Sequence, residues 1–504
     1  MTMKLSMTAI SGADLLKTAA AQFIAKPHKL FIGGEWRDAV SGETFDVEDP
    51  ATGMVIAKVP AASVQDVDLA VIAARKALEG PWSKMTGLER GKLISRFASK
   101  LEELADELAE IEAIDCGKPV AYAKYVDVGL SANTYHYMAG WASKVSGETV
   151  SVSTPGEFHA YTLREPVGVV AQIVPWNFPL VLTAYKLAPS LAAGCTCIIK
   201  PAEQTPLSTL RLAEIIEEVG FPPGVVNVLT GYGATAGAAL AEHPGVDKIA
   251  FTGSTEVGKM VARSATHSLK RVTLELGGKS PMVVFKDADL ERAIPALASA
   301  IFFHQGQVCT AGSRLIVHRS IHDQVVEGIA AEASKLVIGH GLEPGTTMGP
   351  LISSRQIDRV MAYLDQGVAG GASVVSGGGR LGNAGYFMEP TILTGTKAGM
   401  AVVDQEIFGP VLCAMSFDDD ELDTVAAEAN NSPFGLSASI WTRDLSTAHK
   451  TAKRIKAGSV WINMHHFFDP ALPFGGFKQS GWGREQGADA IRTFTEVKSV
   501  CAAL

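Results

Sequence analysis

The pattern of apolar positions divides the chain into a mainly helical first third and a longer part in which strands and helices alternate. After a strand and tight turn at 30–36, apolar residues recur with the period of an α-helix in three long stretches. These predicted helices cover 66–79, 88–114 and 126–146. A further helix is expected from Ala13 to Ile24, within a weakly ordered N-terminal arm formed by residues 1–28.

From residue 167 onward, continuous apolar runs alternate with amphipathic stretches. The first series of predicted strands covers 167–174, 195–200, 225–229 and 248–252, with helices at 182–193, 234–242 and 255–265. Another helix between these strands is expected to be capped by Thr205 and closed by Gly220. Such alternation predicts a parallel sheet covered by helices on both faces.

A second series of the same kind follows the first. It is predicted to contain strands at 271–276, 281–285, 314–317 and 437–442 and helices at 322–336 and 354–369. The fold class is therefore α/β, with two parallel-sheet domains in succession.

Composition and charge limit the class of protein. Hydrophobic residues make up 47% and charged residues 19% of the 504 residues, which is typical of a globular protein. The formal net charge of −9 argues against nucleic acid as a partner. The six scattered cysteines indicate neither a disulfide framework nor a metal site, and they favour a reducing, cytoplasmic compartment.

One apolar stretch, 166–185, approaches the length of a membrane span. Pro175 and Pro179 interrupt it, so we interpret it as a strand, a turn and a helix, and we expect no membrane association. The first 27 residues lack the apolar core of a signal peptide and the arginines of a transit peptide.

Two residues could carry covalent chemistry. Cys309 lies in a Gly/Gln-rich segment between a helix and a strand, and a thiol is a strong nucleophile once ionised. Glu275 lies in an apolar strand followed by two glycines, where burial of an acid is costly unless the acid has a role. Taken singly, each residue is better explained by a structural role: an inert core cysteine for Cys309 and a structural ion pair for Glu275.

A nucleotide site is also suggested. No G-x-G-x-x-G stands at the first strand-to-helix turn, but Gly253 follows a strand and opens a helix whose free N–H groups could hold a pyrophosphate. Lys200 and Glu203 end another predicted strand, where a carboxylate could bind the hydroxyls of a ribose. An ordinary glycine turn and a surface ion pair remain alternatives.

Seven motifs taken in order resolve these alternatives. They are Pro-Trp-Asn-Phe-Pro, Lys-Pro-Ala-Glu, Phe-Thr-Gly-Ser, Glu-Leu-Gly-Gly-Lys, Gly-Gln-Val-Cys, Glu-Ile-Phe-Gly-Pro and Pro-Phe-Gly-Gly, which begin at positions 175, 200, 251, 275, 306, 406 and 473. From about Leu30 to the C-terminus the chain resembles the NAD-dependent, hydrolytic aldehyde dehydrogenase superfamily.

The resemblance implies roles for individual residues. Cys309 would attack the aldehyde, Asn177 and the Cys309 N–H would hold the oxyanion, and Glu275 would activate water to hydrolyse the thioester. NAD would be bound by Ile173, Trp176, Lys200, Glu203, Gly253, Ser254, Leu276, Glu406 and Phe408. Glu203 would repel a 2′-phosphate, which favours NAD over NADP. His304 is a small departure, because asparagine is common there in the family.

The resemblance also implies a domain plan. An NAD-binding domain of Rossmann-like type would comprise 29–147 and 167–277, and a catalytic domain would comprise 278–478. A small β element, 148–166 with 479–504, would build a homo-oligomer, either a dimer or a tetramer.

The substrate is expected to be an apolar, arylalkyl aldehyde, because the loop 463–474 is aromatic and resembles that of bacterial phenylacetaldehyde dehydrogenases. The residues expected around it are Phe178, Leu182, Tyr185, Phe303, Val308, Thr310, Phe467, Phe468 and Phe474. The adjacent His465 and His466 are not expected to bind a metal, because no carboxylate or cysteine cluster accompanies them.

Alternative functions stay open at this point. An aliphatic or betaine-type aldehyde is another possible substrate, and a coenzyme A-acylating aldehyde dehydrogenase would lack a hydrolytic residue such as Glu275. A thiol hydrolase or an inactive binding protein would leave the Lys200 and Glu203 pair unexplained.

Overall fold

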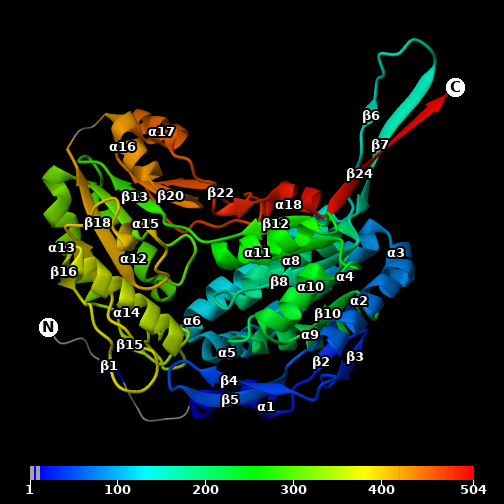
Figure 1. Cartoon of the computed structure of the whole chain (residues 1–504), viewed down its shortest axis with the longest axis horizontal. Helices are drawn as coiled ribbons and strands as arrows, with labels where there is room; N and C mark the ends of the chain where they lie inside the picture. The colour runs from blue at the N-terminus through cyan, green and yellow to red at the C-terminus, as the bar shows by residue number, and fades with distance from the viewer. Residues whose placement is uncertain (1–4, 7–11, 419–420) are drawn as a thin grey trace.

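The computed structural model describes residues 5–6, 12–418 and 421–504. Two α/β lobes lie side by side, and a narrow three-stranded sheet projects from the body of the molecule (Figure 1). Among the described helices, none combines the length and apolar character needed to cross a membrane.

The first lobe is built on an eight-stranded sheet in the order β23-β12-β11-β8-β9-β10-β2-β3. Its parallel strands are β8 (Val169–Ile173), β9 (Thr196–Lys200), β10 (Val226–Val228), β11 (Lys248–Thr252) and β12 (Arg271–Glu275). The strands β2 (Leu30–Ile32), β3 (Glu35–Arg37) and β23 (Gly481–Trp482) are antiparallel to their neighbours.

Helices cover both faces of this sheet, as the alternating pattern predicts. Val169 and Ala171 of β8 share an apolar cluster with residues of α2 (Val64–Glu79), whereas Val170 shares another cluster with α8 (Pro179–Ala193). The other helices of the lobe are α3 (Pro81–Lys84), α4 (Gly87–Glu103), α5 (Ala105–Cys116), α6 (Val120–Tyr122), α7 (Gly129–Trp141), α9 (Leu207–Val219), α10 (Ala238–Glu242), α11 (Thr255–Thr266) and α18 (Gly487–Thr493).

The second lobe is built on a seven-stranded sheet in the order β16-β17-β18-β14-β13-β20-β21. All its strands run parallel except β16 (Ser373–Ser376): β13 (Pro281–Val284), β14 (Arg314–His318), β17 (Thr391–Thr394), β18 (Val411–Phe417), β20 (Ser437–Trp441) and β21 (Ser459–Ile462). Its helices are α12 (Leu290–Phe302), α13 (His322–Ala333), α14 (Ser354–Ala369), α15 (Ala401–Asp404), α16 (Leu422–Asn430) and α17 (Leu445–Arg454). Val283 and its neighbour Val284 belong to different apolar clusters, so this sheet is also covered on both faces.

The projecting sheet contains β6 (Thr149–Val150), β7 (Phe158–Pro166) and β24 (Thr495–Ala503). β24 pairs antiparallel with the whole of β7, from Thr495 opposite Pro166 to Ala503 opposite Phe158. The C-terminal segment 479–504 joins this sheet only in part, because β23 pairs with β12 of the first sheet. Shorter paired strands are β1 (Leu5–Ser6) with β15 (Ile338–Gly339), β4 (Thr44–Asp49) with β5 (Met54–Pro60), and β19 (Phe434–Gly435) with β22 (Phe477–Lys478).

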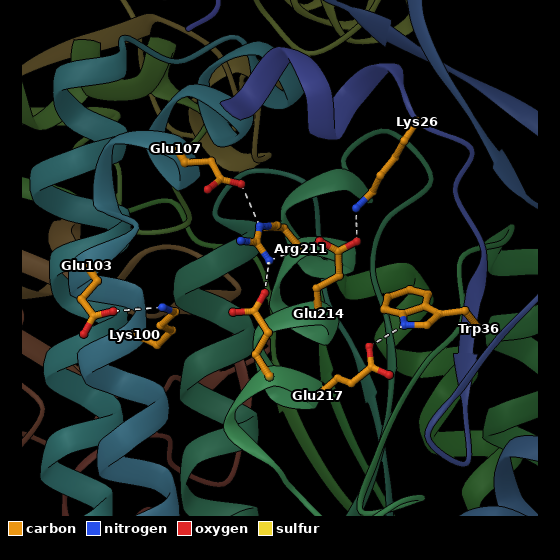
Figure 2. A network of polar contacts seen from close by, with 9 residues as sticks. Lys26, Trp36, Lys100, Glu103, Glu107, Arg211, Glu214 and Glu217 are labelled. Atoms are coloured by element: carbon orange, nitrogen blue, oxygen red, sulfur yellow. Dashed lines mark hydrogen bonds and ion pairs between the residues drawn. The ribbon is translucent and has the colours of Figure 1, made fainter. Parts of the chain in front are cut away.

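The N-terminal arm contacts both lobes, because α1 (Thr18–Ala25) packs against α5 of the first lobe and β1 pairs with β15, which lies between α13 and α14 of the second. Residues 1–4 and 7–11 of the arm lie outside the described part. The helix expected over 13–24 is a 3₁₀ turn (Gly12–Leu15) followed by α1 (Thr18–Ala25). Lys26 forms an ion pair with Glu214 of α9, beside a group in which Arg211 contacts Glu107 at 2.8 Å (Figure 2). Charged side chains of α9 therefore hold the end of the arm.

Several predicted boundaries are wrong for identifiable reasons. The helix predicted over 88–114 is broken at Leu104, where ψ is 18°. The stretch predicted as a helix from 126 begins with a π-helical segment, Ala123–Val128. Strand 271–276 was expected to open the second series, but β12 pairs parallel with β11 in the first sheet.

The predicted cap of α9 is also wrong. The hydroxyl of Thr205 has no hydrogen-bond partner among the described residues, and the helix begins at Leu207. The N–H of Leu207 donates instead to the carboxylate of Asp115, at 2.9 Å, from the neighbouring α5. A cap supplied by tertiary packing leaves no local sequence signal.

Candidate active site

The ends of four adjacent strands bring the predicted cofactor residues together. In the first sheet Ile173 pairs with Lys200 and with Phe251, and Thr252 pairs with Glu275. β12, β11, β8 and β9 are parallel neighbours, so their carboxyl ends form one edge. Open α/β sheets bind ligands at this edge.

In the second lobe, the predicted site residues lie just before the amino ends of adjacent strands. Cys309 precedes β14, Glu406 precedes β18 and Gly278 precedes β13, and these three strands are neighbours. The Gly278 N–H donates to Glu406 Oε1 at 2.9 Å. A Cβ on Gly278 would lie 2.3 Å from the carbonyl oxygen of Cys309, and one on Gly277 would lie 2.1 Å from Glu406 Oε2. Only glycines at both positions allow these segments to meet so closely.

Asn177 is brought to the cysteine segment from the other lobe. Its side-chain Nδ2 donates to the backbone carbonyl of Gln307 at 2.9 Å, and the residue is buried. Its backbone carbonyl accepts a hydrogen bond of 3.0 Å from the ammonium of Lys118, which also contacts Asp127. The amide is therefore fixed two residues from Cys309.

Glu275 is buried, and neither of its carboxylate oxygens has a hydrogen-bond partner among the described residues. Burial and then the neighbouring Glu485 raise the pKa of Glu275 well above its ordinary value, while Lys186 and Arg484 oppose the shift. Lys186 donates to Glu485 at 2.6 Å. An unpaired buried carboxyl is rare in a structural role, since desolvation is then uncompensated.

The thiol of Cys309 is free and partly buried. Burial raises its pKa first, and the carboxyl groups of Glu406 and Glu275 raise it further. Burial also raises the pKa of Glu406, to about 7. Both carboxyl groups therefore act on the thiol, as expected of residues that share a site.

The cofactor-binding prediction fits the geometry of the strand edge. Lys200 Nζ lies 3.7 Å from the carboxylate of the partly exposed Glu203, and burial lowers the pKa of Lys200 to about 8. The carboxylate can accept hydrogen bonds from the hydroxyls of a ribose diol, and the ammonium beside it can donate to their oxygens.

The other cofactor residues suit a pyrophosphate and a planar ring. Ser254 caps α11, its Oγ accepting from the Val257 N–H at 3.3 Å, and a Cβ on Gly253 would lie 2.5 Å from the ring of Phe251. Trp176 and Phe408 meet edge to face at 5.3 Å between ring centroids. Leu276 is buried and packs against Gly258 of α11.

The predicted substrate residues form a linked set of rings. Phe303 stacks on Phe178 at 6.2 Å between ring centroids, and Phe468 contacts Phe474 at 5.9 Å, which in turn contacts Tyr185 at 6.4 Å. Leu182 and Val308 pack in the apolar clusters that include Phe178, and Thr310 is buried beside them. Phe467 differs, because 47% of its surface is exposed.

Comparison with known proteins identifies the family to which this chain belongs. The model described as the aldehyde dehydrogenase family matches residues 36–500. The chain belongs to the aldehyde dehydrogenase family. A phenylacetaldehyde dehydrogenase of Pseudomonas fluorescens is 46% identical over 100% of this chain and 99% of its own, and human retinal dehydrogenase 2 is 46% identical over 97% and 95%.

Solved structures of aldehyde dehydrogenases share the fold. The NAD+ complex of an aldehyde dehydrogenase from Bacillus cereus has a TM-score of 0.95 and 47% sequence identity, and the match covers 97% of this chain and 99% of that one. The predictions of the family and of the α/β fold class are confirmed.

Sequence reasoning missed four residues around the site of this aldehyde dehydrogenase. Lys118 is not among the predicted site residues, but its ammonium donates a hydrogen bond to the carbonyl of Asn177. Tyr122 contacts Phe303 at 5.2 Å, and Lys186 and Glu485 form their ion pair beside Glu275. Contacts between residues 59 or more positions apart give no local signal, although a lysine in an apolar helix, such as Lys186, could have been noticed.

Proposed function

We propose that this NAD-dependent aldehyde dehydrogenase oxidises an apolar arylalkyl aldehyde, of the phenylacetaldehyde type, to its carboxylic acid. The observation that carries the proposal is the set of rings around Phe303, which lies six residues before the nucleophile and links Phe178 with the loop 463–474. Aromatic walls favour an apolar, planar substrate group. A relative with 46% identity is named a phenylacetaldehyde dehydrogenase.

The first step is addition of the Cys309 sulfur to the aldehyde carbon. The thiol loses its proton, the C–S bond forms, and the carbonyl oxygen becomes an oxyanion. Asn177 has two side-chain N–H groups and gives one to Gln307, so the other can hold the oxyanion together with the Cys309 N–H. NAD supplies the acceptor for the hydride that leaves this adduct, and a Cys309 thioester remains.

Hydrolysis completes the reaction. The unpaired carboxylate of Glu275 accepts a proton from water, the oxygen adds to the thioester, and the C–S bond breaks to release the acid and restore the thiol. One aldehyde, one NAD+ and one water thus give one carboxylate, one NADH and two protons.

NAD is the cofactor, as in the Bacillus cereus aldehyde dehydrogenase whose NAD+ complex shares this fold. We propose that Lys200 and Glu203 bind its adenosine ribose, that Gly253, Ser254 and the start of α11 bind its pyrophosphate, and that Glu406 and Phe408 hold the nicotinamide end. Ile173, Trp176 and Leu276 would line the same cleft.

We also propose a homo-oligomer, a dimer or a tetramer, built through β6, β7 and β24. Val150, Leu163 and Val497 are exposed apolar residues on this sheet, which supports burial against another copy. The scattered free cysteines support a cytoplasmic location.

A substrate panel tests the aryl preference. With NAD and no coenzyme A, kcat/KM for phenylacetaldehyde is expected to exceed the values for hexanal and betaine aldehyde at least tenfold, with benzaldehyde between them. A preference for betaine aldehyde would contradict the proposal. Turnover that stops after one NADH per subunit without coenzyme A would favour an acylating enzyme.

A further inference from the structure

Two adjacent histidines follow β21 and take no part in the mechanism described above. His465 and His466 belong to the loop 463–474 that carries Phe468 and Phe474. Burial lowers the pKa of His465 to about 4, and burial followed by the neighbouring His465 lowers the pKa of His466 well below its ordinary value, while the nearby Thr310 carbonyl opposes both shifts. Both imidazoles are therefore neutral at physiological pH, and each has one N–H and one lone pair.

His465 uses both ring nitrogens within the protein. Nε2 lies 2.9 Å from the carbonyl oxygen of Thr310, which can only accept, so Nε2 carries the proton. Nδ1 then accepts from the hydroxyl of Ser439 at 3.0 Å. His465 therefore fixes the backbone of Thr310, the residue after Cys309.

His466 differs because its Nε2 is buried and has no hydrogen-bond partner among the described residues. Aromatic rings surround its imidazole: Phe303 at 5.8 Å, Phe468 at 6.1 Å and Trp461 at 6.2 Å between centroids. The residue has a φ of 57°, a left-handed conformation that is uncommon outside glycine. A polar nitrogen is thus held, at the cost of backbone strain, inside an otherwise apolar set of rings.

His466 Nε2 lies beside residues that are proposed to contact the substrate. Phe303 joins His466 to Phe178 and Tyr122, and the Thr310 carbonyl joins the same loop to the residue next to Cys309. Phe303 and Phe468, two of the rings proposed to hold the aryl group of the substrate, therefore also contact His466. An aryl group without a polar substituent would leave Nε2 unpaired when it excludes water.

We infer that His466 Nε2 is the hydrogen-bond partner of a hydroxyl on the aromatic ring of the substrate. The inference rests on the proposed function and narrows it to ring-hydroxylated arylacetaldehydes. A hydroxyl can both donate and accept, so it matches either tautomer of the imidazole. A charged substituent is excluded, because the neutral imidazole would leave that charge unpaired among rings.

Four probes and three variants test the inference. The probes are phenylacetaldehyde, its 3-hydroxy and 4-hydroxy derivatives, and 4-methoxyphenylacetaldehyde. The methoxy group of the last probe can accept a hydrogen bond but cannot donate one. The variants are His466→Phe, which removes the nitrogen, His466→Gln, which restores a polar group, and Met464→Leu, a control on an exposed residue of the same loop. NADH formation gives kcat/KM for each pair.

In the wild type, at least one hydroxylated probe is expected to exceed phenylacetaldehyde by about tenfold in kcat/KM. His466→Phe should reduce this ratio to about one while phenylacetaldehyde changes less than threefold, and His466→Gln should restore part of it. The ratio should be constant from pH 6 to 8, and Met464→Leu should match the wild type.

The outcomes separate the two proposals. If the ratio in the wild type is already one, or if His466→Phe leaves it unchanged, the inference is overturned while the aryl preference stands. If none of the four aryl aldehydes is oxidised faster than hexanal, the proposed function fails and the inference fails with it. If His466→Phe does not fold, as judged by circular dichroism, the comparison of wild type with His466→Gln decides.

Discussion

The ammonium of Lys118 donates a hydrogen bond of 3.0 Å to the backbone carbonyl of Asn177, whose side chain reaches the segment that carries Cys309. Lys118 is fully buried and is held by Asp127, with Glu112 3.8 Å away. Glu112 also accepts from the Leu180 N–H at 3.3 Å. A buried ionic group therefore holds both ends of the turn from Asn177 to Leu180.

Lys118→Met is expected to lower kcat by ten- to a hundredfold, because the Asn177 carbonyl loses its donor and the oxyanion site loosens. Thermal unfolding should show a loss of about 3–5 kcal/mol, since two buried carboxyl groups lose their cation. Lys124→Met, which removes an exposed ion pair with Asp106, should leave both the stability and kcat nearly unchanged.

A double variant distinguishes positioning from folding. Lys118→Met combined with Asp127→Asn should recover part of the lost stability, because only Glu112 is then left without its cation, but it should not recover kcat. Recovery of both would mean that Lys118 acts only through stability.

Glu275→Gln is expected to separate the two halves of the reaction. The amide cannot accept the proton of water, so steady-state turnover should fall by roughly 10²–10⁴-fold. The burst of about one NADH per subunit should persist in stopped-flow fluorescence, because acylation of Cys309 does not need this base. An equal loss of burst and steady state would assign Glu275 to another role.

The pH dependence of turnover should respond oppositely to the two charged neighbours of Glu275. Its base form is the active one and its pKa is raised, so kcat should increase as pH rises through this pKa. Lys186→Met removes a cation that lowers this pKa and should move the rising limb to higher pH. Glu485→Gln removes an anion that raises it and should move the limb to lower pH. Shifts in the same direction for both variants would contradict the electrostatic assignment.

Glu203→Gln is expected to change the choice between dinucleotides. Loss of the carboxylate removes repulsion of a 2′-phosphate, so kcat/KM for NADP should rise about tenfold while the value for NAD falls. Glu217→Gln, on α9 near Trp36 (Figure 2), serves as a control with the same charge change. A parallel change for both dinucleotides in Glu203→Gln would place this residue outside the ribose site.

The sequence patterns predicted the strands that end at the site, but they did not predict the buried polar contacts that hold the site in place. Strands such as β9 and β11 were found because a buried parallel strand is a continuous apolar run, and their ends position Lys200 and Gly253. The cap of α9 by Asp115 and the bond from Lys118 to Asn177 depend on tertiary packing, so no local pattern encodes them. The alternating pattern alone assigned β12 to the second series, because alternation does not mark where one sheet stops, whereas the domain plan implied by the resemblance grouped 271–275 with the first series.

The amide of Asn177 and the carbonyl of Gln307 meet at 2.9 Å although they come from different lobes. Activity consequently depends on how the two lobes dock against each other. Circular dichroism measures secondary structure and does not detect a change in this docking. A substitution at the contact between the lobes can leave both sheets folded and still move the Asn177 amide away from the Cys309 segment, which would abolish activity. Evolution can therefore tune this enzyme from positions that never touch its ligands, and loss of function without loss of structure is an expected class of variant.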